Sequence, residues 1–174
     1  MIKTRTADPR SLFLVVSLLV LNGCDSSNGS PSPSPPGFST ITFPNGNVQF
    51  FAPETYTHQS EPNDTVAITL GDESGIVVRF NLHNLPDAVA EDFLHSQAND
   101  KGLQINRIGN KATFSETGAR SEGGRDYVMT FWQVGFGDAL VVISAEVDRE
   151  QEENQTVKDC LNRVPKMIES MQRY

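Results

Sequence analysis

Two consecutive segments carry apolar residues on both of their alternating faces, and this pattern constrains the fold of the chain more than any other. In 126–134 the two faces hold Tyr127, Met129 and Phe131 on one side and Val128, Trp132 and Val134 on the other. In 139–147 they hold Ala139, Val141, Ile143 and Ala145 opposite Leu140 and Val142. Side chains alternate between the faces of a strand, so a strand apolar on both faces must be covered on both. We therefore expect these strands at the centre of a sheet that lies between two layers.

The other strand signals fall into hairpins. A turn-like segment, 71–75, separates two alternating runs and predicts a hairpin with one buried face. Gly109-Asn110 separates a second such pair, and Gly123-Gly124 leads into the segment 126–134. The strands expected in addition to the two central ones cover 48–51, 66–70, 76–82, 103–108 and 111–120.

Two segments follow the helical period. The first runs from Pro86 to Lys101, with Pro86 suited to its first turn and Gly102 to a left-handed C-terminal position. Its predicted apolar stripe is Val89, Ala90, Phe93, Leu94 and Ala98. The second is expected to begin within the acidic stretch 146–153, with a kink or a new turn at Pro165. Its apolar side would carry Val157, Cys160, Leu161, Val164, Ile168 and Met171.

The resulting fold class is α+β, an antiparallel sheet covered by helices on its faces. This order of elements resembles the PsbP-like fold, including the small bacterial DcrB-like lipoproteins. The resemblance rests on Val48–Pro53 with Tyr56, Asp92–Leu94, Gly109–Thr113, Tyr127–Trp132 and Met167–Met171. It implies an α/β/α sandwich and a non-catalytic accessory, chaperone or docking role.

The N-terminus has the organisation of an export signal. Lys3, Arg5 and Arg10 precede an apolar run, 12–21, which is too short for the roughly 20 residues of a membrane-spanning helix. This pattern indicates a cleaved leader rather than a permanent transmembrane anchor.

The residues after the apolar run resemble the lipobox of bacterial lipoproteins. Leu21 and Gly23 occupy the aliphatic and small positions before Cys24. The resemblance implies cleavage before Cys24 and palmitate-type acyl chains on its thiol, which together hold a protein firmly on a membrane. Asp25 favours the inner membrane if the source is an enteric bacterium. The alternative is an ordinary cleaved signal, with Cys24 as a stray thiol.

These features divide the chain into a signal peptide (1–23), a lipidated cysteine with a Ser/Pro-rich linker (24–37) and one globular domain (38–174). The linker composition favours an extended spacer of about 40 Å. The domain would lie in the periplasm or outside the cell, anchored to the cell membrane or the outer membrane. With Cys24 lipidated, Cys160 has no disulfide partner, and its position predicts a buried structural thiol.

Composition and motifs argue against several functions. The chain has a formal net charge of −8, and the leader removes three basic but only one acidic residue, so nucleic acid is a poor partner. No phosphate-binding loop, nucleophile elbow or zinc-protease motif occurs. His58, His83 and His95 lack ligand-like spacing, and no metal, cofactor or small-molecule substrate is evident.

Two local features admit more than one interpretation. The acidic stretch 146–153 fits a cation site, but carboxylates at a helix N-terminus are favoured by the helix dipole alone. Phe131, Trp132 and Phe136 fit an exposed aromatic binding patch. However, Phe131 and Trp132 point to opposite faces of the sheet, so at most one belongs to such a patch, and core packing is favoured.

Three functions remain compatible with the sequence. The leading hypothesis is a non-enzymatic envelope lipoprotein that is anchored in a membrane and binds another protein or assists an envelope complex. The second is an immunity lipoprotein, whose acidic surface would cover the basic rim of an exported toxin. The third is a hydrolase with a site assembled from distant residues, for which Asp126, His83 and His95 are the residues to replace.

Overall fold

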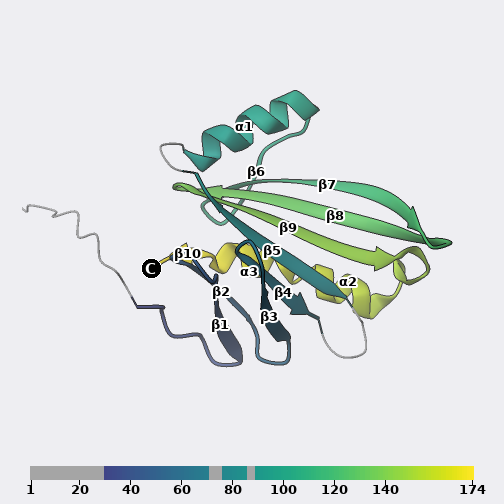
Figure 1. Cartoon of the computed structure of the whole chain (residues 1–174), viewed down its shortest axis with the longest axis horizontal. Helices are drawn as coiled ribbons and strands as arrows, with labels where there is room; N and C mark the ends of the chain where they lie inside the picture. Colours follow the sequence, from purple (N-terminus) through teal and green to yellow (C-terminus); the bar gives the residue numbers. More distant parts are fainter. Residues whose placement is uncertain (1–29, 71–75, 86–88) are drawn as a thin grey trace, which may run out of the picture.

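The computed structural model describes residues 30–70, 76–85 and 89–174, which form two antiparallel sheets and three α-helices (Figure 1). The larger sheet has seven strands in the order β3-β4-β5-β9-β8-β7-β6, and the smaller has three in the order β1-β2-β10. The strands are β1 (Phe38–Thr42), β2 (Val48–Pro53), β3 (Thr57–Glu61), β4 (Thr65–Thr69), β5 (Val77–Asn84), β6 (Asn106–Ile108), β7 (Lys111–Glu122), β8 (Arg125–Phe136), β9 (Ala139–Asp148) and β10 (Gln172–Arg173). The helices are α1 (Ala90–Lys101), α2 (Gln155–Leu161) and α3 (Val164–Ser170), with a short 3-10 helix at Arg149–Gln151.

The two strands predicted to be central are central. β9 lies between β5 and β8, and both of its faces are largely buried along Ala139–Asp148. α1 covers one face of the seven-stranded sheet, while α2, α3 and the three-stranded sheet lie on the other (Figure 1). The predicted α+β class, an antiparallel sheet with helices on its faces, is therefore confirmed, with a second small sheet that the sequence pattern did not indicate.

Two groups of apolar side chains hold these layers together. The main core fills the space between the seven-stranded sheet, the small sheet, α2 and α3, and it includes the stacked rings of Phe50 and Phe80, 4.6 Å apart. The second, smaller core lies under α1. Its members are Ala90, Leu94, Ala98, Ala112, Phe114 and Leu140. All buried side chains of both cores lie between Ile41 and Met171, so a fragment that begins before residue 38 keeps all of them.

The predicted hairpins are present. β4 pairs with β5, β6 with β7, and β7 with β8, each in antiparallel register. Gly109, Gly123 and Gly124 have positive φ in the turns where the sequence placed them. The predicted turn 71–75 lies outside the described residues.

The helices differ from the prediction at their starts. Val89 has extended backbone angles and precedes α1, so that helix begins at Ala90, while Pro86 lies outside the described residues. Val89 and Phe93 are 55% and 40% exposed, which leaves Ala90, Leu94 and Ala98 as the buried stripe. Gly102 ends the helix in the predicted left-handed conformation, with φ 66°.

The acidic stretch does not begin the last helix. β9 continues to Asp148, and α2 begins only at Gln155, where the side chain of Asn154 accepts a hydrogen bond from the Thr156 N–H. Strand pairing with β8 keeps Glu146 and Asp148 extended, which outweighs their favourable position at a helix N-terminus. Pro165 lies in the first turn of a separate helix, α3, as one of the two predicted alternatives.

Part of the predicted spacer packs against the domain. The side-chain oxygen of Gln49 accepts a hydrogen bond from the Ser32 N–H (2.8 Å), and its Nε2 donates to the Ser32 carbonyl (3.4 Å). Gln49 is completely buried. Phe38 N–H donates to the Pro35 carbonyl across a turn in which Gly37 has φ 79°. The chain thus makes its first described contact with the domain at Ser32 rather than at Phe38.

Candidate functional site

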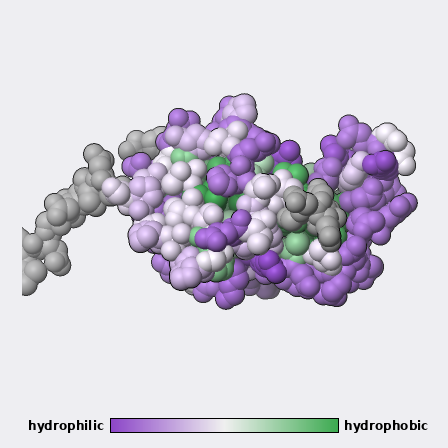
Figure 2. All heavy atoms as spheres, turned by 90° about the horizontal axis from the view of Figure 1, so that it is seen from below, coloured by the Kyte–Doolittle hydropathy of each residue, from purple (hydrophilic) through white to green (hydrophobic). Residues whose placement is uncertain are grey.

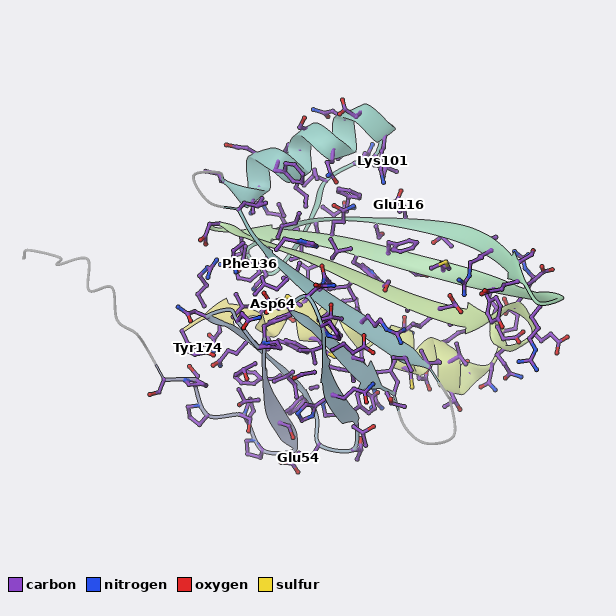
Figure 3. The ribbon with its side chains drawn as sticks, in the orientation of Figure 1. Glu54, Asp64, Lys101, Glu116, Phe136 and Tyr174 are labelled. Atoms are coloured by element: carbon purple, nitrogen blue, oxygen red, sulfur yellow. The ribbon has the colours of Figure 1, made fainter. Side chains whose placement is uncertain are left out.

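α1 covers only part of one face of the seven-stranded sheet (Figure 1). α1 packs over Gly135, where an added Cβ would lie 2.9 Å from the Ala90 carbonyl oxygen. The Ala90 N–H donates to the Gly137 carbonyl (2.9 Å), which fixes the start of the helix on the sheet. At the other end of α1, Lys101 Nζ lies 2.5 Å from Glu116 Oε1 on β7 (Figure 3). Beyond this ion pair no described helix covers this face, which we call the open sheet face.

Three side chains of β8 form an apolar line on the open sheet face. Tyr127, Met129 and Phe131 are separated from Gly135 by even numbers of residues, so they share its face of the sheet. All three are half-buried although no described helix lies over them. The prediction that this strand is covered on both faces is therefore wrong for these positions, because α1 spans only the end of β8 near Gly135.

The strands beside β8 complete an open depression of about 670 Å³. In the register, Phe131 lies opposite Ser144 of β9, which lies opposite Arg79 of β5. The adjacent row places Val142 opposite Asn81. The depression is thus apolar along β8 and β9 and polar along β5.

The β3–β4 turn forms the polar border of the depression. Asn63 and Asp64 adopt positive φ, a conformation that Asn and Asp tolerate better than other residues with a side chain. Asp64 Oδ1 accepts hydrogen bonds from the backbone N–H (2.9 Å) and Nδ2 (2.6 Å) of Asn45. Asn81 Nδ2 donates to the Asn63 carbonyl (2.7 Å). These contacts hold the turn at a fixed place beside the open sheet face.

Arg79 and Arg120 on the open sheet face are each paired with carboxylates. Arg79 Nε lies 3.1 Å from Glu61 Oε2. Arg120 contacts both carboxylate oxygens of Glu146 at 2.9 and 2.8 Å and also lies 3.1 Å from Glu122 Oε2. Such paired, exposed charges contribute little to stability. They leave the face nearly neutral and therefore suited to a partner that offers both apolar and polar contacts.

A chain of polar groups in and beside the main core connects the segment after β2 with α2 and the start of α3. Arg163 donates to the Tyr56 hydroxyl (3.0 Å), the hydroxyl donates to Cys160 Sγ (3.9 Å), and Cys160 Sγ donates to the Leu70 carbonyl (3.7 Å). Burial, and then the thiol of Cys160, raise the pKa of Tyr56, and Arg163 opposes them. Cys160 is 8% exposed, as the sequence predicted for a structural thiol.

A buried lysine supports the end of α3. Lys111 is 4% exposed, and its Nζ donates to the Glu169 carbonyl (2.9 Å) and lies over the ring of Phe136. Burial lowers the pKa of Lys111, while the charge of Glu169 raises it. A cation at a helix C-terminus stabilises the last carbonyls, so a structural role accounts for this side chain.

The residues considered for catalysis do not come together. His58 lies on β3, His83 on β5 and His95 on α1, where His95 Nε2 is 3.9 Å from a carboxylate oxygen of Glu91. Asp126 lies near the tip of the β7–β8 hairpin and accepts a hydrogen bond from Ser121 (2.5 Å). Within the described ranges, no three His, Cys, Asp or Glu side chains are grouped as a metal site would require.

Of the three aromatic residues considered for binding, only Phe131 lies on the open sheet face. Trp132 and Phe136 pack against the main core. The sequence marked Phe131 as part of a strand that is apolar on both faces. Which part of this strand α1 covers depends on the tertiary structure, and the alternation of residues does not predict it.

The predicted lipidation site lies outside the described residues. Leu21, Gly23, Cys24 and Asp25 all precede residue 30, so lipidation remains a prediction. None of the helices in the described part of the chain has the length and apolar composition needed to cross a bilayer.

Fold and surface together define an α+β domain with a partly covered antiparallel sheet. A crystal structure from Bacteroides thetaiotaomicron VPI-5482 is similar to it, with a TM-score of 0.59 and 12% sequence identity over 73% of this chain. This chain covers 45% of that longer chain. At this identity, the likeness concerns the fold alone.

Two further solved structures are similar at lower scores. LpqN, described as involved in cell envelope biogenesis of Mycobacterium tuberculosis, has a TM-score of 0.49 and 14% identity, with 80% of this chain and 86% of LpqN covered. Cyanobacterial PsbP from Synechocystis sp. PCC 6803 has a TM-score of 0.36 and 14% identity, with 84% and 99% covered. At TM-scores below 0.5, neither likeness carries an argument about this chain. No known sequence family and no curated protein sequence matches the chain.

Proposed function

We propose that this protein is a lipid-anchored, non-catalytic binding module of the bacterial cell envelope that engages a protein partner through its open sheet face. The observation that supports this proposal best is the line of Tyr127, Met129 and Phe131, half-exposed on a face that α1 leaves uncovered. Aromatic and methionine side chains are enriched in protein interfaces, and a polar border around an apolar centre is their usual arrangement.

The partner contact is tested by photocrosslinking in cells. A benzophenone amino acid replaces Phe131 in the full chain, and the matched control carries it at Phe93, an exposed phenylalanine on the outer side of α1. We expect a discrete adduct with one envelope protein from position 131 and none from position 93. Equal labelling from both positions, or no adduct from position 131, would contradict the proposal.

Anchoring is tested separately through Cys24. The sequence pattern supports acylation of this thiol, and Cys24→Ser removes the acceptor. We expect the unmodified chain to incorporate radioactive palmitate and to fractionate with membranes. The Cys24→Ser chain should incorporate none and leave the membrane fraction. A variant that stays equally membrane-bound would refute the anchor but would not affect the crosslinking result.

A further inference from the structure

A second surface lies on the opposite side of the molecule from the open sheet face, where the chain enters the domain. The outer face of the small sheet and the side of α3 enclose a groove of about 300 Å³. It is lined by Phe38, Phe51, Pro53, Arg163, Lys166 and Met167. We call it the entry groove. It lies in the layer of β1, β2 and α3, and the seven-stranded sheet separates it from α1 (Figure 1).

The entry groove is apolar at its centre and basic at its rim. Phe38 is 38% exposed, one of only three large apolar side chains among the described residues that reach this degree of exposure. Elsewhere on the lower side of the molecule, hydrophilic residues cover the end formed by the β7–β8 hairpin, and apolar residues reach the surface in small areas (Figure 2). The entry groove thus combines an exposed phenylalanine with two cations, although the chain as a whole is acidic.

The two cations differ in how they are held. Arg163 donates to the Tyr56 hydroxyl, its guanidinium lies 5.7 Å from the centre of the Tyr56 ring, and no described carboxylate lies within 4.0 Å of it. Lys166 Nζ is 3.1 Å from Glu169 Oε2, a pair in which both side chains are largely exposed. Glu54 also follows β2 near this end of the small sheet (Figure 3). Among the described residues, Arg163 is thus a positive charge held in place by Tyr56 and without an ion-pair partner.

The path of the chain places the entry groove next to the tether. Ser32 is hydrogen-bonded to Gln49 on β2, and Phe51 and Pro53 share the outer face of that strand with Gln49. Ser32 is only eight positions after Cys24, which limits the tether to roughly 28 Å at full extension. A lipid on Cys24 would therefore keep the outer face of the small sheet close to the bilayer.

We propose that the entry groove is a membrane-contact surface, in which Phe38 enters the interfacial region of the bilayer while Arg163 and Lys166 bind anionic headgroups. This inference rests on the anchor at Cys24 in the proposed function. One apolar side chain and two cations bind a bilayer weakly by themselves, but a short tether raises their effective concentration at its surface. The contact orients the domain, so that the open sheet face points away from the membrane.

The test uses residues 24–174 coupled through Cys24 to a maleimide lipid in vesicles of phosphatidylcholine and phosphatidylglycerol. Cys160 is buried and competes poorly for the maleimide. Phe38→Trp introduces an indole at the groove, Val89→Trp introduces one at an exposed position just before α1, and the unsubstituted chain reports the baseline of Trp132. Acyl-brominated phosphatidylcholine then quenches indoles that reach the bilayer.

We expect the indole introduced at position 38 to be quenched at least about twofold more than that at position 89, and only when anionic lipid is present. Arg163→Gln and Lys166→Gln should each weaken the contact roughly fivefold. Arg163→Lys keeps the positive charge and should retain most of the membrane contact. Equal quenching at positions 38 and 89, or equal quenching on vesicles without phosphatidylglycerol, would overturn the proposal. Because the tether is made chemically, neither outcome depends on whether cells lipidate Cys24.

Discussion

Individual polar side chains inside the domain are placed so that each has a partner. Among the described residues, no buried side-chain nitrogen or oxygen lacks a hydrogen bond. Tyr56 is the most informative example, because its hydroxyl accepts from Arg163 on one side and donates to the thiol of Cys160 on the other. The aromatic ring supplies core packing, and the hydroxyl connects the segment after β2 to Cys160 on α2.

Tyr56→Phe should change how stability depends on alkaline pH. The pKa of Tyr56 is raised above its ordinary value of 10.0, so above about pH 10 the unfolded state releases this proton more readily than the folded state. The contribution of the Tyr56 hydroxyl to folding stability is therefore fully present below about pH 10, and it is lost as the pH rises further. We expect the variant to lose about 1 kcal/mol at pH 8. Between pH 9 and pH 11, the free energy of unfolding should then decrease less in Tyr56→Phe than in the unsubstituted chain.

Urea unfolding followed by the fluorescence of Trp132 measures both quantities. Tyr127→Phe is the matched control, since Tyr127 is a half-exposed tyrosine on the open sheet face. An alkaline loss of stability that is the same in Tyr56→Phe and in the unsubstituted chain would show that the buried hydroxyl is not its source.

At the scale of elements, the seating of α1 decides how much of the sheet stays open. The helix approaches β8 so closely at Gly135 that its own backbone, rather than a side chain, forms the contact. Lys101 and Glu116 hold its other end, so α1 is fixed at both ends over one part of the sheet.

Gly135→Ala should destabilise the domain by about 1–3 kcal/mol, because the added methyl group meets the backbone of Ala90, which cannot move without lifting α1. Gly118→Ala on β7 is the control, since nothing lies within 4 Å of its added Cβ, and it should be neutral or slightly stabilising. Thermal unfolding compares the two. Equal melting temperatures would show that α1 accommodates the methyl group and is less firmly seated than the structure indicates.

The elements that the sequence predicted are those whose pattern reflects burial. The central strands, three hairpins, α1 and the new helix at Pro165 follow from apolar spacing and turn residues. β3 was missed because Thr57–Glu61 is almost entirely exposed and polar, so pairing with β4 alone makes it a strand. β10 was missed because its two residues pair with β2 across most of the domain sequence. β1 pairs with β2 across a short turn, but Ile41 is its only buried residue, so it carries little apolar alternation.

At the candidate site, the sequence pattern likewise did not predict correctly which apolar side chains are covered. This applies both to the start of α1 and to the open sheet face. Val89 and Phe93 fit a helical apolar stripe, yet the close approach at Gly135 leaves both exposed. Phe131 carried a sequence signal for burial, and only the position of α1 shows which part of the face remains uncovered.

For the molecule as a whole, the attachment of residues 30–37 sets the distance between the domain and any anchor. Gln49 is buried and uses its entire side-chain amide on the backbone of Ser32. Gln49→Leu should therefore release this segment and lengthen the tether. We expect amide exchange at Ser32 to become at least about tenfold faster in hydrogen–deuterium exchange, while exchange in β9 stays slow.

Gln59→Leu, at an exposed position of β3, serves as the control and should leave exchange at Ser32 unchanged. If Gln49→Leu accelerates exchange across the whole domain to the same degree, the variant reports global unfolding. In that case the attachment of Ser32 is a minor consequence of the fold rather than a device that sets the tether length.

Val48 and Gln49, near the start of the domain, pair with the last strand, β10. The small sheet is therefore complete only when the C-terminal residues are present. β5 likewise pairs with β9, and more than fifty residues of sequence lie between these two strands. A chain that emerges from the ribosome N-terminus first therefore cannot bury its main core until synthesis is almost finished. If the predicted leader directs this chain unfolded through a secretion channel, such late closure would give the export machinery time to engage it before the native sheet forms.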